Sequence, residues 1–367
     1  MKPLPFPAIV TDDVGNLHVA WQEAGNLDPI NGSARAPVSP ADGDKTDIVH
    51  RVIDGETGAI SLPLVISRQD DNAHVDDKNP SLATRGGAVV AAWETLVNTN
   101  TRQVLVSRFN ASTTPPTWSA APAVAFALQT GTAPSPSVGL GASGTAFVAW
   151  VENSGRTIAG GTVGQSGDRD IVLCALAPAD ASCIAPLLVS TGTDTGTSSE
   201  PAIAVAGNGA AESVHVVWSD TAGRAQGTIN VLHKRLQLNG AVPIIGPTTS
   251  VSTPGNSLQN PTVAAAPDST EIVVLWIDNT PNLSHSEFTM FSSVGIDSDS
   301  DNDGVDDACT FDAPALVIDA EGNFSHSTKD SVPTLALSEQ GGIFVACAHQ
   351  PPGTNPPAEI FAFGFQY

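Results

Sequence analysis

The chain has 367 residues, 41% of them hydrophobic, which is enough for the core of one large domain or of two to three average ones. Its net charge of −23 argues against nucleic acid and anionic membranes as partners, because both are polyanions and would be repelled. No apolar run reaches the roughly 18 residues that a membrane span requires, so we expect no membrane insertion. With 33 Gly, 28 Pro and only 14% charged residues, the composition is typical of many short strands joined by turns.

Six repeats follow one another along the chain. Each opens with Pro and a short alternating strand, passes a Gly- or Asp-bearing turn and continues into a second strand that ends in Trp. The pairs are residues 7–10 and 17–21, 80–83 and 88–93, 136–139 and 146–150, 201–204 and 214–218, 261–264 and 272–276, and 333–336 and 343–347. In the sixth repeat Cys347 takes the place of Trp.

The spacing between repeats leaves room for two more strands in each. Third strands are visible at residues 48–51, 104–108 and 229–233, and fourth strands at 63–67 and 186–190. Four antiparallel strands repeated six times predict an all-β, six-bladed β-propeller of four-stranded antiparallel blades. Blades must stack in a ring because only neighbouring blades can cover their apolar faces.

We therefore predict one propeller domain over residues 1–367, carrying an acidic insertion at 295–312. The expected blades are residues 7–79, 80–135, 136–200, 201–260, 261–332 and 333–367. In the last blade, residues 360–365 form the third strand. Its fourth strand has to come from residues 4–6 or is missing, which would leave an unpaired edge.

The order of these elements resembles the sialidase-like, BNR-type propeller superfamily over nearly the whole chain. The shared features are the Pro-led strand, the strand ending in Trp before an acid, the third strand ending near Arg, and the outer strand. The family's Asp-box turn, Ser-x-Asp-x-Gly-x-Thr-Trp, does not occur in the sequence. For a sialidase the resemblance implies three arginines that bind the substrate carboxylate, a Tyr nucleophile assisted by Glu, and an Asp acid–base.

Sialidase chemistry itself is not expected here. Tyr367 is the one tyrosine and stands last in the sequence. Arg51, Arg108 and Arg235 stand at similar places late in the third strands, which is typical of blade structure. No Gly-x-Ser-x-Gly turn, paired-His zinc motif or phosphate-binding glycine loop is present.

An acidic run at residues 297–309 carries the clearest ligand pattern. Carboxylates at alternate positions followed by Gly304 present hard oxygen ligands to one point. The run resembles a thrombospondin type 3 repeat, a calcium-binding module, although Thr310 stands where the last acid is expected and Asp312 is the substitute. The alternative is a solvated acidic loop, which would be self-repulsive. We predict a structural Ca²⁺ site whose ligands are Asp299, Asp301, Asp303, the carbonyl of Val305, and Asp307.

A second group of acids follows the Trp of each repeat. It consists of Glu23, Glu94, Glu152, Asp220 and Asp278, with His349 in the sixth unit. One interpretation is a carboxylate ring that binds a cation, an amine or a sugar, or supplies an acid–base pair. Because the feature recurs in five blades, we expect these acids to be blade structure that caps a neighbouring loop. His18 and His215, at similar registers of second strands, are expected to be core residues, and the connection from residue 22 to 47 is expected to overhang the binding face.

The cysteines bear on where the protein works. Cys174 and Cys183 lie in strand-like runs on either side of a turn, which predicts a disulfide across a hairpin. For Cys309 and Cys347, a second disulfide and a buried thiol at Cys347 remain open alternatives. An even number of cysteines in an acidic chain favours an oxidising compartment, either extracellular, at the cell surface or periplasmic. Three prolines within residues 1–7 do not fit a signal peptide, so we expect the leader to be absent from this chain.

These observations predict an exported, calcium-stabilised propeller that acts as a non-enzymatic binding or surface-interaction module. The expected ligand is an unidentified protein or carbohydrate, and the propeller would be part of a larger surface protein. The alternative is a carbohydrate-active glycoside hydrolase that uses carboxylates on the loop face. A third interpretation is a purely structural domain. The fold is compatible with all three.

Overall fold

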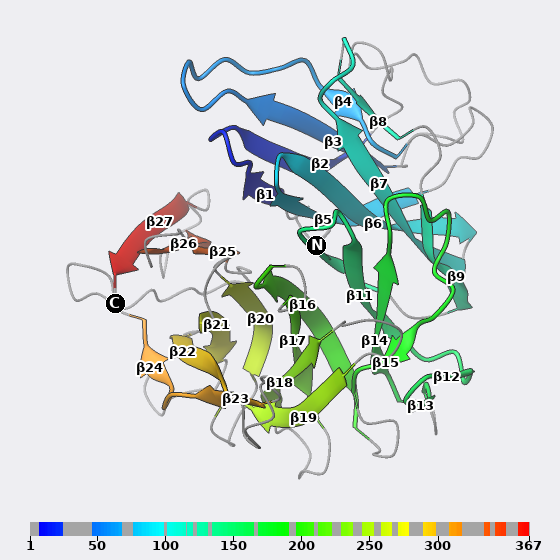
Figure 1. Ribbon diagram of the computed structural model, residues 1–367, viewed down its shortest axis with the longest axis vertical. Helices are drawn as coiled ribbons and strands as arrows, with labels where there is room; N and C mark the ends of the chain where they lie inside the picture. Colours follow the sequence, from blue (N-terminus) through cyan, green and yellow to red (C-terminus); the bar gives the residue numbers. More distant parts are fainter. Residues whose placement is uncertain are drawn as a thin grey trace. The chain divides into compact units, whose positions relative to one another are not determined.

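The computed structural model is all-β in the residues that it describes, with no helix among them (Figure 1). Those residues are 7–24, 46–67, 76–98, 101–114, 116–119, 123–130, 134–164, 168–190, 196–208, 212–221, 229–237, 244–252, 258–265, 271–278, 289–298, 308–317, 334–337, 342–349 and 359–366. The chain divides into two compact units, Met1–Gly164 with Val172–Leu188, and Gln165–Ile171 with Val189–Tyr367. No described segment forms a helix of the length and apolarity that a membrane span needs.

Unit 1 contains three antiparallel sheets, here called blades 1 to 3. Their strands are β1 Ala8–Thr11, β2 Leu17–Ala24, β3 Thr46–Ile53 and β4 Leu64–Val65; β5 Asp76–Arg85, β6 Ala88–Asn98, β7 Thr101–Asn110, β8 Thr117–Trp118 and β9 Ala123–Thr130; and β10 Ser137–Leu140, β11 Ala146–Glu152, β14 Asp170–Leu176 and β15 Leu187–Leu188. A ribbon of β12 Thr157–Ile158 and β13 Gly161–Thr162 follows β11. In each blade the strands pair in chain order, with β9 as an extra partner of β7.

Unit 2 contains blades 4 to 6. Their strands are β16 Ser198–Ala206, β17 Ser213–Asp220, β18 Asn230–Gln237 and β19 Ile244–Ser250; β20 Leu258–Ala265, β21 Glu271–Asp278, β22 Thr289–Ser298, β23 Ala308–Phe311 and β24 Ala315–Leu316; and β25 Thr334–Leu337, β26 Gly342–His349 and β27 Glu359–Gln366. β27 is the third strand predicted for the last blade. Residues 4–6, considered for its fourth strand, lie outside the described residues.

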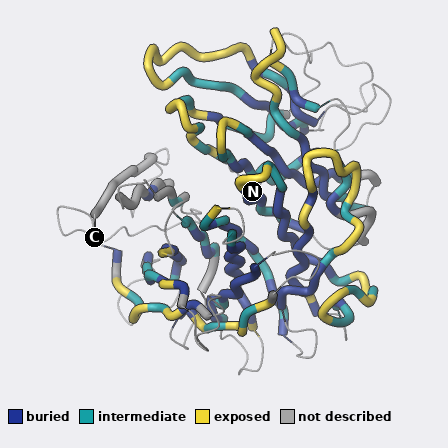
Figure 2. Tube along the Cα trace, viewed as in Figure 1, coloured by how far each residue is buried: buried dark blue, intermediate teal, exposed yellow. Residues whose placement is uncertain are grey.

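The predicted first and second strands are present as antiparallel pairs in blades 1 to 6 of the described chain. Their ends differ from the prediction, because the second strands of blades 1 to 5 continue past Trp and the inner strands of blades 2, 4 and 5 begin before Pro. The predicted third strands fall within β3, β7 and β18, and the predicted fourth strands contain β4 and β15. Second strands are apolar on both faces, as in β11, which is buried along its whole length. Figure 2 shows this burial in the middle strands, while the turns of blade 1 are exposed.

The tryptophan that ends a second strand packs against the blade before it. Trp93 belongs to one apolar cluster with Ala20 and Ile48 of blade 1. Trp276 belongs in the same way to a cluster with Val217 and Val231 of blade 4. Each buried aromatic side chain removes about 150–250 Å² from water, so the joints between blades hold much of the hydrophobic stabilisation.

In blades 2 to 5 the residue before the proline of the repeat is strained. Asn79, Ser135, Glu200 and Asn260 have φ of 53°, 43°, 54° and 51°, and each directly precedes the Pro that opens its repeat. In blades 2, 4 and 5 the pairing of the inner strand shifts register at this point. Proline has no N–H for the ladder, so in these three blades a bulge accommodates it within the inner strand.

A serine after the fourth strand ties that strand to the third. Ser67 Oγ accepts the N–H of Ile48 at 2.9 Å, Ser190 Oγ that of Ile171 at 2.9 Å, and Ser252 Oγ that of Val231 at 3.0 Å. The same hydroxyls of Ser67 and Ser190 donate to Asp47 and Asp170, at 3.4 and 2.7 Å. The Ser that ends the predicted fourth strands is therefore part of the blade's hydrogen bonding.

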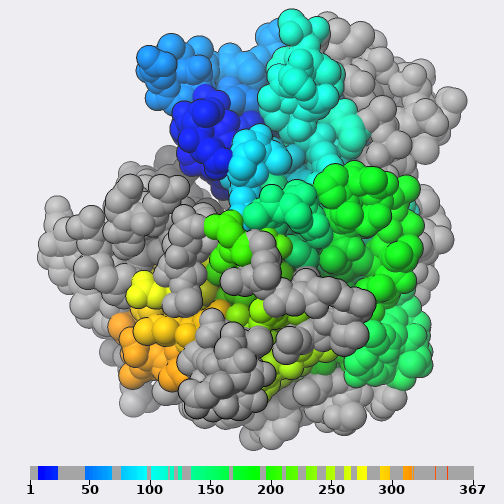
Figure 3. Space-filling view, in the orientation of Figure 1, coloured from blue at the N-terminus to red at the C-terminus, as the bar shows by residue number. Residues whose placement is uncertain are grey.

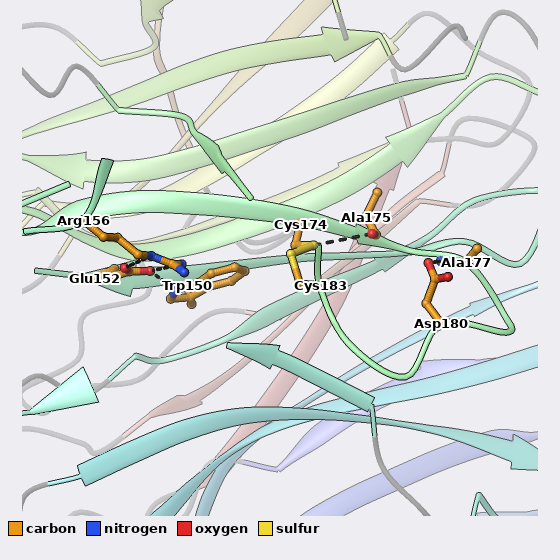
Figure 4. Close-up of a disulfide and its surroundings, with 8 residues drawn as sticks. All are labelled: Trp150, Glu152, Arg156, Cys174, Ala175, Ala177, Asp180 and Cys183. Carbon is orange, nitrogen blue, oxygen red and sulfur yellow. Dashed lines mark hydrogen bonds and ion pairs between the residues drawn. A yellow bond between two sulfur atoms is a disulfide. The ribbon is translucent and has the colours of Figure 1, made fainter. Parts of the chain in front are cut away.

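The predicted disulfide between Cys174 and Cys183 is present (Figure 4). It does not cross a regular hairpin, however, because Cys183 lies in the connection between β14 and β15. That connection reaches blade 2, where the N–H of Cys183 donates to the carbonyl of Val124 at 2.8 Å. Cys309 is a free, buried cysteine, so the second disulfide considered for it is not formed.

Replacing Cys174 and Cys183 together by Ala should lower the free energy of unfolding by about 2–3 kcal/mol, because the short closed loop no longer restricts the unfolded chain. Urea unfolding without reductant measures the change, and wild type with reductant added is the matched control. Equal midpoints for wild type and the double variant in the absence of reductant would contradict the prediction.

Candidate functional site

The acidic run predicted to bind calcium forms the connection between β22 and β23. Its predicted ligands Asp299, Asp301, Asp303, Val305 and Asp307 all lie outside the described residues. Its base is described: Ser298 pairs with Ala308 and Asp297 with Cys309. The run is therefore a hairpin connection whose two ends are held together by the sheet.

Asp297, the first acid of that run, points into the protein. Its Oδ2 accepts from Arg235 Nε at 2.7 Å and from Ser213 Oγ at 3.4 Å. Burial raises the pKa of Asp297, while the contact with Arg235 opposes this shift. Because Asp297 is bound to Arg235, it belongs to the joint between blades 4 and 5 and is not a ligand of the acidic loop. Among the described residues, no group of three or more His, Cys, Asp or Glu side chains is placed to hold a metal ion.

The acids two residues after Trp bind the indole of their own blade. The Nε1–H donates to Glu23 at 2.7 Å from Trp21, to Glu152 at 2.9 Å from Trp150, and to Asp220 at 3.0 Å from Trp218. For these three acids the structural interpretation is confirmed, although the partner is the tryptophan and not a neighbouring loop. Figure 4 shows Glu152 between the Trp150 indole and Arg156, which donates from both Nε and Nη2.

In blade 2 the indole N–H also donates to a carboxylate, but the acid lies on another strand. Thr95 stands two residues after Trp93, and the acid is Asp77, which faces Thr95 on the inner strand β5. Asp77 Oδ1 accepts from Thr95 Oγ1 at 2.5 Å and from Trp93 Nε1 at 3.2 Å. In blade 4 the hydroxyl and the carboxyl are exchanged, since Ser198 on the inner strand donates to Asp220 at 2.7 Å.

Two further glutamates connect neighbouring blades at the same end of the strands. Glu94 Oε2 lies 3.5 Å from the N–H of Ser135 in blade 3, and Glu200 Oε2 lies 2.7 Å from the N–H of Asn260 in blade 5. Both N–H groups belong to residues with positive φ before proline. Sequence reasoning missed Glu200, and its place directly before Pro201 was the signal that could have identified it.

The inner strands also carry carboxylates that remain partly exposed. In unit 1 Asp76 accepts from Thr46 Oγ1 and Lys78 Nζ, both at 2.5 Å. In unit 2 Glu200 accepts from Ser219 Oγ at 3.2 Å. Both side chains combine a fixed position with access to solvent, which is what an acid–base group requires.

Stacked histidine pairs occupy equivalent places in blades 1 and 4. His18 Nδ1 lies 3.0 Å from His50 Nε2, and His215 Nδ1 lies 3.1 Å from His233 Nε2. All four side chains are buried, as expected for His18 and His215. In blade 1 Trp118 Nε1 donates to His50 Nδ1 at 3.3 Å, so His50 must donate from Nε2 to His18. His18 then donates from its own Nε2 to Asp12, at 3.3 Å.

The pair in blade 4 has no such donor. The position of Trp118 beside blade 1 is taken beside blade 4 by Phe311, whose ring meets His233 edge-on with centroids 5.0 Å apart. His233 Nδ1 consequently has no hydrogen-bond partner among the described residues.

The three arginines late in the third strands do not all occupy equivalent positions. Arg235 and Arg108 pair with the residue three before Trp on the second strand, His215 and Val90. Arg51 pairs with Val19, two before Trp, so it stands one residue earlier in its strand than the other two.

A small pocket of about 210 Å³ opens beside His18. It is lined by Asp12, Asn16, His18, Val52, Ser61, Gly87, Val89, Phe109, Ala111 and Pro116. Asp12 is its one carboxylate, and both of its oxygens already accept from Asn16. Figure 3 shows the surface of the first two blades, blue and cyan, next to each other on this unit. The described lining of the pocket therefore offers one carboxylate, whereas a glycosidase uses two.

Several predicted features fall outside the described residues. They are residues 25–45 of the connection expected to overhang the binding face, and Tyr367. The side chains of Cys347 and His349 are likewise not described. Asp278 ends β21.

Comparison with known proteins identifies the fold. No family model and no curated protein matches the sequence. A protein of unknown function from Dyadobacter fermentans is similar in structure, with a TM-score of 0.55 and 12% identity, over 98% of this chain and 93% of that one. An α-L-arabinanase from Penicillium chrysogenum, solved with arabinobiose, has a TM-score of 0.54 and 12% identity, over 99% and 94%. The chain has the fold of these β-propellers.

Acid should destabilise the protein through its buried histidines. Burial first, and the neighbouring charge second, lower the pKa of His50 and of His215 from 6.5 to about 3. The unfolded chain therefore binds protons that the folded chain does not, and stability present above pH 6.5 is lost as the pH falls towards 3.

Unfolding measured between pH 6.5 and 4 checks this, with His50→Gln as the variant that cannot titrate at one site. The variant should lose stability less steeply than wild type, by up to tenfold in the unfolding constant per pH unit. Parallel pH profiles for wild type and His50→Gln would show that His50 is not responsible.

Proposed function

We propose that the protein is a glycoside hydrolase that acts on a neutral glycan. The observation that carries this proposal is the likeness to the Penicillium arabinanase over nearly the full length of both chains. Because the likeness is in fold and the identity is 12%, it supports the class of activity without naming the sugar. The net charge of −23 favours a neutral glycan, since an anionic one would be repelled.

Glycoside hydrolysis needs two carboxyl groups beside the glycosidic bond, one of them acting as acid or base. Glu23, Glu152 and Asp220 are poor candidates, because each accepts the indole N–H of its own blade. Asp76 and Glu200 are better candidates for one such group, each of them considered within its own unit. They stand on the inner strands β5 and β16, partly exposed, and each is held by hydrogen bonds from its own unit.

Release of reducing sugar from arabinan, xylan and other neutral polysaccharides tests the activity. Asp76→Asn and Glu200→Gln keep the size and the acceptor oxygen but remove the proton chemistry. If either residue is the acid–base group, its variant should lower kcat by about 10²–10⁴-fold.

Asp54→Asn is the matched control, because Asp54 is a partly exposed aspartate that caps the turn after β3. Hydrolysis that survives in both test variants would show that neither carboxyl is the acid–base group. Absence of hydrolysis on every glycan, with glycan binding retained, would refute the hydrolase and support the second candidate.

That second candidate is a non-enzymatic binding module, for a protein or a carbohydrate, within a larger surface protein. Two features favour it. The acids after Trp serve the blades themselves, and the pocket beside His18 offers a single carboxylate. Sialidase chemistry is not part of the proposal. The closed ring of six blades stays a prediction, as do the blade boundaries.

Structural calcium in the β22–β23 connection is the second part of the proposal. The alternate aspartates Asp299, Asp301, Asp303 and Asp307, with the carbonyl of Val305, form the ligand set, and the paired base at Ser298 and Ala308 would hold the ends of the loop. A site of this kind binds at about 10⁻⁴–10⁻³ M, which fits an exported protein. The Cys174–Cys183 disulfide is consistent with an extracellular, cell-surface or periplasmic location.

Calorimetric titration of calcium into chelator-treated protein, with melting curves of both forms, measures this site. Calcium at 100 times its Kd should stabilise the fold by about 2.7 kcal/mol. Asp301→Asn combined with Asp303→Asn should abolish the heat and the shift in Tm. Asp312→Asn is a separate variant, which tests whether Asp312 replaces the last acid of the motif, where Thr310 stands. No heat with wild type would mean that the run is only an acidic connection.

A further inference from the structure

The connection between β14 and β15 of blade 3 reaches blade 2 and pairs there with β9. The N–H of Val124 on β9 donates to the carbonyl of Ala181 at 3.0 Å, and the N–H of Cys183 donates to the carbonyl of Val124 at 2.8 Å. Val124 and Ser182 form a parallel bridge. Residues 177–186 of this connection are called here the strap, and all of these contacts lie within unit 1.

The strap completes the outer edge of blade 2. On its other side β9 pairs with β7, where Leu105 stands opposite Val124. The N–H and the carbonyl of one strand residue point to the same side, so those of Val124 point away from β7 and towards the strap. Without the strap these two groups would form an unpaired strand edge, which can pair with another chain.

Apart from the disulfide, the described chain holds the middle of the strap weakly. Residues 177–182 are exposed and Ile184 is 87% exposed, so burial of apolar side chains does not fix them. Cys183 is partly buried and packs against the apolar cluster of blades 2 and 3. Asp180 accepts the N–H of Ala177 at 2.7 Å (Figure 4), but this bond closes a turn within the strap and does not tie it to blade 2.

The two ends of the strap are held separately. At its start, Arg108 of blade 2 donates to the carbonyl of Leu176 at 2.9 Å. The carboxylate of Asp180 also attracts Arg108, but it is exposed, so water screens this attraction. After the strap, Leu187 pairs with Leu173 in the sheet of blade 3. The middle of the strap can therefore move while both of its ends stay in place.

The same connection in blade 1 stays on its own blade. Between β3 and β4, the N–H of Asp54 donates to the carbonyl of Ala59 at 2.9 Å, and that of Ser61 donates to the carbonyl of Val52 at 2.8 Å. This connection carries no cysteine. The fold therefore does not require such a connection to reach a neighbouring blade, and in blade 3 the reach and the disulfide occur together.

We infer that the Cys174–Cys183 disulfide is a redox latch, which keeps the strap on β9 and whose reduction uncovers the edge of blade 2. A dithiol is the reductant. Its first thiolate breaks the S–S bond and forms a mixed disulfide with one cysteine, and its second thiolate then displaces that cysteine. The dithiol leaves as a disulfide, and the two electrons and two protons that it loses convert Cys174 and Cys183 into thiols.

Once the latch is reduced, two exposed backbone hydrogen bonds to Val124 remain for the middle of the strap. Such bonds exchange for bonds to water at little net cost. They therefore do not balance the conformational entropy that the exposed strap residues gain when they are released. In an oxidising compartment the latch stays closed, and a dithiol opens it.

Native-state amide hydrogen exchange of the full chain, with and without a dithiol, tests the inference. In the reduced protein the amides of Val124 and Cys183 should exchange about tenfold faster or more, because the bonds between β9 and the strap are broken. Opening the strap exposes little surface, so these rates should not depend on low urea concentrations, whereas those of β11 should, through global unfolding. A protease that cleaves before large apolar residues should cut before Ile184 in the reduced protein alone.

Cys174→Ser combined with Cys183→Ser is the matched control for the reductant. This variant should show the fast exchange both with and without the dithiol. If it folds poorly, reduction of the folded wild type is still decisive, with the completeness of reduction measured by counting thiols. Unchanged exchange at Val124 and Cys183 after complete reduction would overturn the inference. An acceleration that follows urea as the amides of β11 do would also overturn it, because the disulfide would then stabilise the whole fold and not the strap.

Discussion

The joints between blades are the constraint on which this structure depends, because a blade that is apolar on both faces cannot be stable alone. In β6, Val89, Ala91 and Trp93 face blade 1, while Val90 and Ala92 face blade 3. In β21 the alternation is the same, with Trp276 towards blade 4 and Leu275 towards blade 6. Every second strand that is apolar throughout therefore makes its neighbours obligatory, and the hydrophobic effect stabilises the joints more than the sheets.

Burying an indole at each joint creates a second requirement, since its N–H must find an acceptor. Blades 1, 3 and 4 provide a carboxylate two residues after Trp, and blade 2 provides Asp77 from the facing strand. Three acids of the ring that the sequence suggested, Glu23, Glu152 and Asp220, therefore serve the fold itself. A hydrolase with this fold would have to use other carboxylates, and Asp76 and Glu200 on the inner strands are the candidates that we propose.

The two histidine pairs show how equivalent positions diverge. Both pairs are buried and share one geometry, yet the donor that satisfies His50 in blade 1 is replaced by Phe311 beside His233 in blade 4. Blades 2 and 4 diverge in the same way, through the exchange of a carboxyl and a hydroxyl between their inner and second strands. Repeats keep the packing that every blade needs and vary the polar contacts, so polar groups are where individual blades acquire individual properties.

The sequence by itself determined the blade pattern, because the period of Pro-led and Trp-terminated strands records which residues must be buried. It also identified the Cys174–Cys183 pair, which stands close in the chain, and the histidines His18 and His215 as core residues. The sequence could not show a register difference of one residue. Arg51 was aligned with Arg108 and Arg235, but it lies one position earlier in its strand. A shift of one residue places a side chain on the opposite face of the sheet.

Only the tertiary structure decided what the polar residues do. Whether an acid after Trp faces solvent or the nearby indole depends on how its strand is buried. Whether Asp297 belongs to a calcium loop or to Arg235 depends on a side chain that is distant in sequence. Hydrophobic periodicity is a local property of the chain and is visible in one dimension. Hydrogen-bond partners and charge neighbours are set by the stacking of one blade on the next, and they become visible only when the blades are in place.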